Sequence, residues 1–180
     1  MSEFERARGA REHELRNEEI VERILVSGSD SEMKELQAVH RLTEEQMVSM
    51  RYWSRLRHET KTDHPVNDRE TTPEEDELGV RIEYIEPQVL DAVRALRQKG
   101  YKTTYSGFAQ LGAAQTIWFD KEQAVALPES TQSDIEQRWG VKIRTEPGSI
   151  WIDCLETRLK IEDLKQIWDS IAETLPSFSK

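Results

Sequence analysis

The stretch Val141-Lys-Ile-Arg-Thr-Glu-Pro-Gly-Ser-Ile-Trp-Ile-Asp-Cys154 decides how the C-terminal half of this chain folds. Apolar residues alternate with polar ones on both sides of a Glu-Pro-Gly sequence. Alternation with a period of two is typical of strands that bury one face. Proline presets φ and glycine permits a positive φ, so Pro-Gly favours a tight turn. The stretch therefore predicts a β-hairpin with strands at 141–145 and 149–154.

A second hairpin is expected upstream of this one. Residues 101–106 and 116–120 have strand composition, and Gly107 and Gly112 lie in the segment that joins them. We expect Tyr101, Thr103 and Tyr105 to share one face of the first strand.

Helical patterns surround both hairpins. Residues 87–100 begin with proline and end with glycine, which suit the first turn and the end of a helix. A short helix is expected from a capping box at 133–136 to Gly140, and a last helix places apolar residues on one stripe between 161 and 175. An extended lead-in is expected at 80–84. The order predicts an α+β domain over 80–180, arranged α-ββ-α-ββ-α with an antiparallel sheet.

The N-terminal residues 1–57 are predicted to form a charged helical segment. Capping boxes occur at 29–32 and 43–46, and the second opens a helix with Met47, Met50, Trp53 and Leu56 on one side. Such a narrow stripe needs a partner, either the C-terminal domain or a second copy of the chain. We therefore expect binding of a protein partner or self-association through these helices. Residues 58–79 are predicted to be an acidic flexible linker, because they contain few aliphatic residues.

Composition limits the possible functions. The net charge is −10, and residues 58–79 alone carry two basic and eight acidic side chains. This balance makes nucleic acid an unfavoured partner, although it leaves room for a local basic patch on the C-terminal domain. No apolar run is long enough to span a bilayer, the first residues do not have the pattern of a signal peptide, and there is one cysteine. We expect a cytoplasmic protein that does not interact with membranes.

The segment 99–108, Lys-Gly-Tyr-Lys-Thr-Thr-Tyr-Ser-Gly-Phe, is the first candidate site. Glycine permits close approach of a ligand to the backbone, the hydroxyl groups are hydrogen-bonding partners, and nearby Arg and Lys side chains attract anions. The simpler interpretation is an ordinary helix-to-strand connection, where Tyr and Thr are common for packing reasons. The candidate ligand-binding residues are Lys102, Thr103, Thr104, Ser106, Gly107 and Phe108.

The same segment carries a resemblance. Lys99-Gly-Tyr-x-Thr followed by a turn that contains Ser106-Gly107 and by an Ile-x-Phe strand resembles a small uncharacterised bacterial and phage-associated domain. The signature of that domain is a Lys-Gly-Tyr-x-Thr strand running into a Ser-Cys-x-Gly-His turn. The likeness covers about 85–176 and includes Leu127-Pro128, Trp168 and Leu175-Pro176, but the turn here has neither Cys nor His. Residues 101–107 are more faintly similar to a Tyr-x-Thr-Thr-x-Ser segment of the tRNA wybutosine-synthesis methyltransferases, a similarity that implies tRNA and S-adenosylmethionine.

The second candidate site is one face of the sheet. Alternation assigns the apolar residues of the three clearest strands to the core face and leaves Trp118, Lys142, Arg144 and Trp151 on the opposite face. Aromatic and cationic residues together resemble the platforms that bind single-stranded nucleic acid. The competing interpretation, which the net charge favours, is that the N-terminal helices cover this face and bury both Trp side chains.

No catalytic residue, cofactor or metal site is predicted. All four His residues precede residue 65, and the pair of clusters His58-Glu59 and Asp63-His64 has no recognised ligand spacing. Cys154 fits a small buried apolar position, and Asp120 and Asp153 could form a carboxylate pair only if their strand ends are neighbours. The sequence thus favours a non-enzymatic binding or protein-interaction module. The alternative is a nucleotide- or RNA-linked domain, methyltransferase-related, that uses the Tyr101–Phe108 turn.

Overall fold

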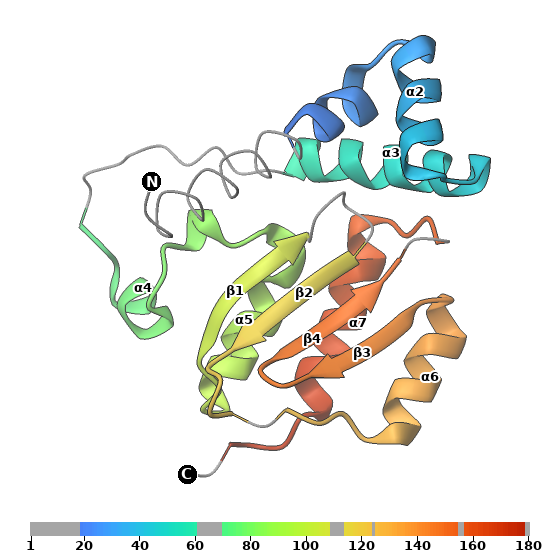
Figure 1. Cartoon of the computed structure of the whole chain (residues 1–180). Helices are drawn as coiled ribbons and strands as arrows, with labels where there is room; N and C mark the ends of the chain where they lie inside the picture. The colour runs from blue at the N-terminus through green and yellow to red at the C-terminus, as the bar shows by residue number, and fades with distance from the viewer. Residues whose placement is uncertain (1–18, 61–69, 109–113, 124, 155–156, 179–180) are drawn as a thin grey trace, which may run out of the picture.

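The computed structural model describes residues 19–60, 70–108, 114–123, 125–154 and 157–178. They form an α+β protein with a helical N-terminal part and a four-stranded antiparallel sheet (Figure 1). From residue 87 onward the order is α-ββ-α-ββ-α, as predicted from the sequence. The bounds of these elements are α5 Pro87–Gln98, β1 Thr103–Phe108, β2 Ala114–Phe119, α6 Glu129–Trp139, β3 Lys142–Glu146, β4 Ser149–Asp153 and α7 Ile161–Thr174.

The two hairpins join through their inner strands, which gives the strand order β1-β2-β4-β3. The turn between β3 and β4 is Pro147-Gly148, and Gly148 has a φ of 76°, as the Glu-Pro-Gly sequence predicts. The carbonyl of Gly148 also accepts a hydrogen bond of 2.7 Å from the N–H of Phe119. The turn of the second hairpin is therefore attached to the end of β2.

Helices α5 and α7 cover one face of the sheet, and the other face is open toward the viewer in Figure 1. The covered face holds the residues that alternation assigns to the core: Ile117, Phe119, Val141, Ile143, Ile150, Ile152 and Cys154. Leu96 from α5 and Leu164 from α7 are fully buried against them. Each such aliphatic side chain stabilises the fold by about 1.5–3 kcal/mol.

The N-terminal helices form a second, smaller cluster. Helical residues 19–27, α2 (Asp30–His40) and α3 (Glu44–Thr60) bury Leu25, Leu36, Met47 and Met50 together. Two of the three predicted capping boxes are present; the third, at 133–136, does not start a helix, because α6 already begins at Glu129 and has no side-chain cap. The Ser29 hydroxyl accepts from the N–H of Glu32, and the Thr43 hydroxyl accepts from the N–H of Gln46 at 3.1 Å.

The second half of α3 packs on the C-terminal domain. Trp53 is fully buried in the main core, and its indole N–H donates to the carbonyl of Cys154 at 2.9 Å. The Tyr52 hydroxyl donates to the carbonyl of Leu159 at 2.8 Å. The apolar stripe of α3 therefore packs within the same chain. Met47 and Met50 belong to the small cluster, and Trp53 belongs to the main core.

The segment predicted to be a linker is partly folded. Residues 58–60 belong to α3, and Pro73–Leu78 forms α4, where Glu75 and Leu78 are buried; residues 61–69 lie outside the described part. Thr72 and Glu75 form a capping box, and the Glu75 carboxylate also accepts from the N–H of Ile82 at 3.1 Å. This bond helps to fold the expected extended lead-in into the 3₁₀ helix η1 (Ile82–Tyr84). Local capping signals therefore outweigh the polar composition of this segment.

Candidate functional site

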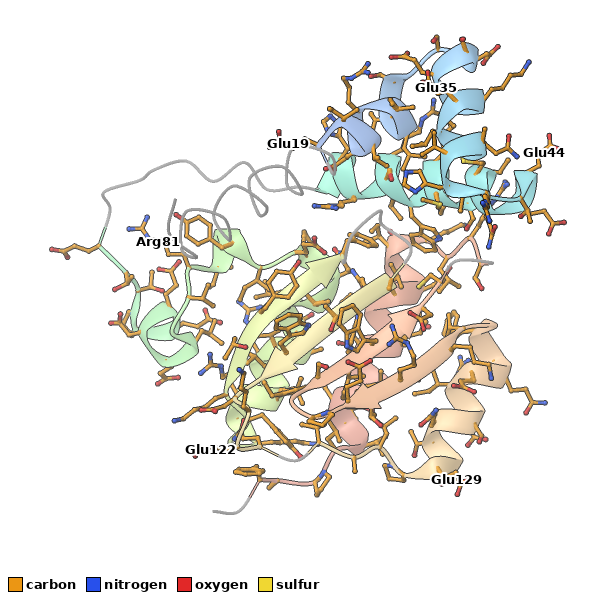
Figure 2. All side chains as sticks on the ribbon, in the orientation of Figure 1. Glu19, Glu35, Glu44, Arg81, Glu122 and Glu129 are labelled. Carbon is orange, nitrogen blue, oxygen red and sulfur yellow. The ribbon has the colours of Figure 1, made fainter. Side chains whose placement is uncertain are left out.

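A row of aromatic side chains crosses the open face of the sheet. The rings of Tyr105 on β1 and Trp118 on β2 lie 5.6 Å apart between centroids, and those of Trp118 and Trp151 on β4 lie 6.2 Å apart. Tyr105 and Trp118 are 48% and 44% exposed, and Trp151 is half-buried. Side chains of this face project toward the viewer in Figure 2. We call Tyr105, Trp118 and Trp151 the aromatic row.

Tyr105 reaches the open face because β1 contains an irregularity in register between Thr103 and Tyr105. An extra residue in a strand reverses the alternation of its side chains. Tyr101 and Thr103 are buried, whereas Tyr105 lies opposite Trp118 and is exposed. The prediction that these three residues share one face was wrong, because simple alternation does not anticipate the bulge.

The row ends at Arg144 on β3, whose guanidinium carbon lies 5.2 Å from the centre of the Trp151 ring. Two carboxylates hold this guanidinium: Asp153 accepts from Nε and Nη2 at 2.5 and 3.0 Å, and Glu146 accepts from Nη1 at 2.7 Å. These bonds raise the pKa of Arg144. The indole N–H of Trp151 donates to the Ser149 hydroxyl at 2.9 Å. The cationic end of the row is thus already neutralised within the chain.

All four predicted sheet-face residues lie on this face. Trp118 is opposite Ser149, Trp151 is opposite Arg144, and Lys142 is opposite Asp153. The expectation that the N-terminal helices cover the face does not hold for the described helices. α3 crosses the ends of the strands, where Trp53 meets Phe108 with ring centroids 6.0 Å apart (Figure 1).

The predicted ligand-binding turn is a strand, and its residues do not converge on one site. Thr103, Gly107 and Phe108 are buried, Ser106 is half-buried, and Lys102 and Thr104 are exposed. Lys102 to Ser106, together with Val80, Tyr84 and Ile85, line a groove of about 840 Å³ beside β1. Part of the predicted site therefore faces a groove, while Phe108 belongs to the core.

Gly107 makes room for a side chain of this chain rather than for a ligand. It has a φ of 139°, and a Cβ atom there would lie 2.8 Å from Oε1 of Glu86. The Glu86 carboxylate accepts from the N–H of Phe108 at 3.3 Å and from the side-chain amides of Gln88 and Gln115 at 2.5 and 3.4 Å. Burial raises the pKa of Glu86 in spite of these bonds. The sequence gives no direct signal for this cluster, because Glu86 and Gly107 are 21 residues apart.

Three of the cations expected to attract an anion near β1 are bound to other groups of the chain. Arg97 donates from Nε to the Thr103 hydroxyl at 3.0 Å and from Nη2 to the Thr103 carbonyl at 2.6 Å. Lys99 donates to the carbonyls of Ala172, Glu173 and Leu175 at the end of α7, and Arg94 forms an ion pair of 2.6 Å with Glu74. These cations hold elements of the fold together. Most of the positive charge expected to attract an anion near β1 is therefore already bound within the chain.

The remaining candidates give no constellation within the described residues. Asp153 lies opposite Ala114 at the start of β2, whereas Asp120 follows the end of that strand, so the two carboxylates are about 20 Å apart at 3.3 Å per residue. Burial raises the pKa of the Cys154 thiol to about 12, which fits its place in the core. In the part of the chain that the structure describes, no cluster of three or more His, Cys, Asp or Glu residues could hold a metal ion.

Comparisons of this chain with protein-family models, with curated proteins and with solved structures gave no match. Among the described residues, no helix has the length and apolar character needed to cross a bilayer.

Proposed function

We propose that this protein is a non-enzymatic protein-interaction module, that its binding surface is the aromatic row on the open face of the sheet, and that its partner is a polypeptide. The observation that carries the proposal is the pair Tyr105 and Trp118, large aromatic rings that touch each other and stay nearly half exposed. Contiguous exposed apolar surface on a soluble protein marks an interaction site, and Trp and Tyr supply most of the binding energy at such sites.

The form of the sheet supports a face-on partner over one that adds a strand. Both edge strands have backbone groups bound by side chains: Glu86 and Arg97 bind β1, while Glu136 and Gln132 from α6 bind Ile143 on β3. Such contacts protect sheet edges from pairing with another chain. The open face has no equivalent cover from the described helices.

Charge supports a polypeptide over a nucleic acid. The chain carries a net charge of −10, and the guanidinium of Arg144, which lies beside the row, is shared between Asp153 and Glu146. Phosphate groups would meet these carboxylates, and the guanidinium beside the row is already paired with them. The alternative function, a nucleotide- or RNA-linked domain at Tyr101–Phe108, has weaker support. Arg97 and Glu86 already bind backbone groups of that segment, and Phe108 is buried in the core. Self-association through the N-terminal helices, with a second copy of this chain as the partner, remains a second prediction.

The test is a selection of peptides from a display library with the full chain as bait, followed by affinity measurements on three variants. Tyr105→Ala and Trp118→Ala should each weaken binding of the selected peptides by about 30-fold or more, the effect of losing a hot-spot residue. The control is Val39→Ala on α2, where the side chain is 69% exposed and lies away from the sheet. It should bind as the unmodified chain does.

Circular dichroism must show that the variants are folded; we expect stability changes of roughly 1 kcal/mol or less for these partly exposed side chains. Peptides whose affinity is the same for Trp118→Ala and for the unmodified chain would contradict the proposal. So would a failure to select any peptide together with binding of single-stranded RNA that depends on Trp118.

A further inference from the structure

The aromatic row borders a pocket at the turn between β3 and β4. The pocket has a volume of about 490 Å³, and its lining includes Trp118, Trp151, Asp120, Lys121, Glu146 and Pro147. The Trp118 and Trp151 rings are inclined at 54° to each other, so they form two walls rather than one flat surface. The attachment of Gly148 to Phe119 holds the turn against the end of β2 and fixes the third side.

The charged groups of this lining favour a cation. Asp120 and Glu146 contribute two carboxylates, and Lys121 contributes one ammonium group. The faces of the two indole rings add the negative side of their quadrupoles. The three charged side chains of the lining therefore carry an excess of one negative charge, and Arg144, which pairs with Glu146 from outside the lining, is also bound to Asp153.

The chain itself shows how this surface holds a guanidinium. Arg144 lies 5.2 Å from the centre of the Trp151 ring and is flanked by carboxylates on both sides. The pocket beside Trp118 offers the same two elements, an indole face and nearby carboxylates. Trp118 remains 44% exposed, so its ring has surface left for a second cation.

We propose that this pocket takes a cationic side chain, the guanidinium of arginine or the ammonium of lysine, from the polypeptide that binds the aromatic row. The inference rests on the proposed function, because it names the chemistry of the partner at one end of the same surface. The occupant is a segment with at least one basic residue next to apolar or aromatic ones. The match between an acidic protein and a basic segment also speeds association at low salt.

The experiment is a titration of the ¹⁵N-labelled full chain with N-acetyl-arginine amide, followed by NMR on the indole N–H signals. Phe substitutions at Trp118 and Trp151 assign these signals. The Trp118 signal should shift in a saturable way. N-acetyl-citrulline amide, which has the same shape without the charge, should bind about 5- to 30-fold more weakly, the range expected for loss of a cation–π contact.

Asp120→Asn should weaken binding of the arginine probe, and added salt should weaken it further. Glu129→Gln at the start of α6 is the matched control, because it removes an exposed carboxylate away from the pocket (Figure 2) and should leave binding unchanged. No shift of Trp118 or Trp151 up to the solubility limit of the arginine probe, or equal shifts with citrulline, would overturn the inference.

The two proposals fail separately. If selected peptides depend on Tyr105 and Trp118 but keep their affinity when citrulline or norleucine replaces their basic residues, the binding surface stands and the cation pocket is wrong. If the arginine probe binds at Trp118 but no peptide depends on the row, the pocket stands and the proposed function is wrong.

Discussion

At each edge of the sheet a glutamate binds a backbone N–H of the edge strand, but the pKa values of the two carboxyls are shifted in opposite directions. On β3, Glu136 from α6 accepts from the N–H of Ile143 at 2.9 Å; on β1, Glu86 at the start of α5 accepts from the N–H of Phe108 at 3.3 Å. The bond to Ile143 and the nearby Lys142 lower the pKa of Glu136, whereas burial raises the pKa of Glu86. The same contact with a strand therefore accompanies a stabilised carboxylate at Glu136, which also has Lys142 as a partner, and a destabilised one at Glu86, where burial outweighs the hydrogen bonds.

Because both edges are bound by side chains, the open face is left as the surface for a partner. The two edges also use glycine differently. Gly107 is where β1 admits the Glu86 carboxylate, and Gly140 ends the helix that carries Glu136.

Gly107→Ala should produce the largest loss of stability. Alanine is strained at a φ of 139°, and its Cβ atom would displace the Glu86 carboxylate from a place fixed by three donors. We expect a loss of about 2–4 kcal/mol from backbone strain and broken hydrogen bonds. Urea unfolding followed by circular dichroism measures this loss.

Gly140→Ala is the matched control at the other edge. Its φ is 65°, and a Cβ atom there would meet only the Thr157 hydroxyl oxygen at 3.9 Å. The cost should be about 1 kcal/mol, from left-handed backbone alone. Equal losses for the two variants would show that Glu86 does not depend on the space at Gly107.

Replacement of Glu86 by Gln should change how stability depends on pH. The folded pKa of Glu86 is raised above the value of about 4.5 expected in the unfolded chain. Between these two values the folded chain keeps a proton that the unfolded chain has lost, so this carboxyl makes stability fall as pH rises. Gln has no such proton. In addition, its amide can donate to Oε1 of Gln88, a buried oxygen without a partner in the described part of the chain.

The measurement is the free energy of unfolding of both chains from acid to neutral pH. The stability of the unmodified chain relative to Glu86→Gln should decline as pH rises above about 4.5 and then level off. A difference that is flat across this range, or that rises, would mean that the Glu86 carboxylate is not destabilised by burial.

Sequence patterns account for most of the fold. Alternation and turn chemistry predict both hairpins, and capping boxes at Ser29 and Thr43 predict two helix starts. The segment 70–79 is the main difference. It has the Thr72-x-x-Glu75 box, a proline in the first turn and Gly79 at the end, but its acidic composition favoured a linker. These local signals determine the structure there, because Leu78 finds a place in the core that composition does not reveal.

The candidate site was only half predictable. Alternation predicts the open face for Trp118 and Trp151, because it holds in β2 and β4. It does not predict that face for Tyr105, because the irregularity in β1 leaves no signal in a single sequence. Alternation also cannot say that α3 packs at the strand ends through Trp53. That placement depends on contacts between residues about 100 positions apart, and it decides whether the aromatic row is covered.

Replacement of Glu136 by Gln should have the smallest effect and the opposite dependence on pH. The folded pKa of Glu136 is lowered, so in the range below about 4.5 the unfolded chain binds the proton first and this carboxylate adds stability as pH rises. Its contribution is fully present at neutral pH and is lost as pH falls through the folded pKa. The advantage over Glu136→Gln at neutral pH should be about 1 kcal/mol or less, because the Lys142 partner is 77% exposed and water screens the pair.

The test is to plot the stability difference for Glu136→Gln beside that for Glu86→Gln over the same pH range. Relative to its own variant, the unmodified chain should gain stability with rising pH at Glu136 and lose it at Glu86. Added salt should reduce the Glu136 difference more, because Glu136 is paired with the exposed ammonium of Lys142, whereas burial is the main cause of the pKa shift of Glu86. If both stability differences changed with pH in the same direction, the contrast between Glu86 and Glu136 would be wrong. The hydrogen bond that both carboxylates accept from a strand N–H would then determine the pH dependence at both edges.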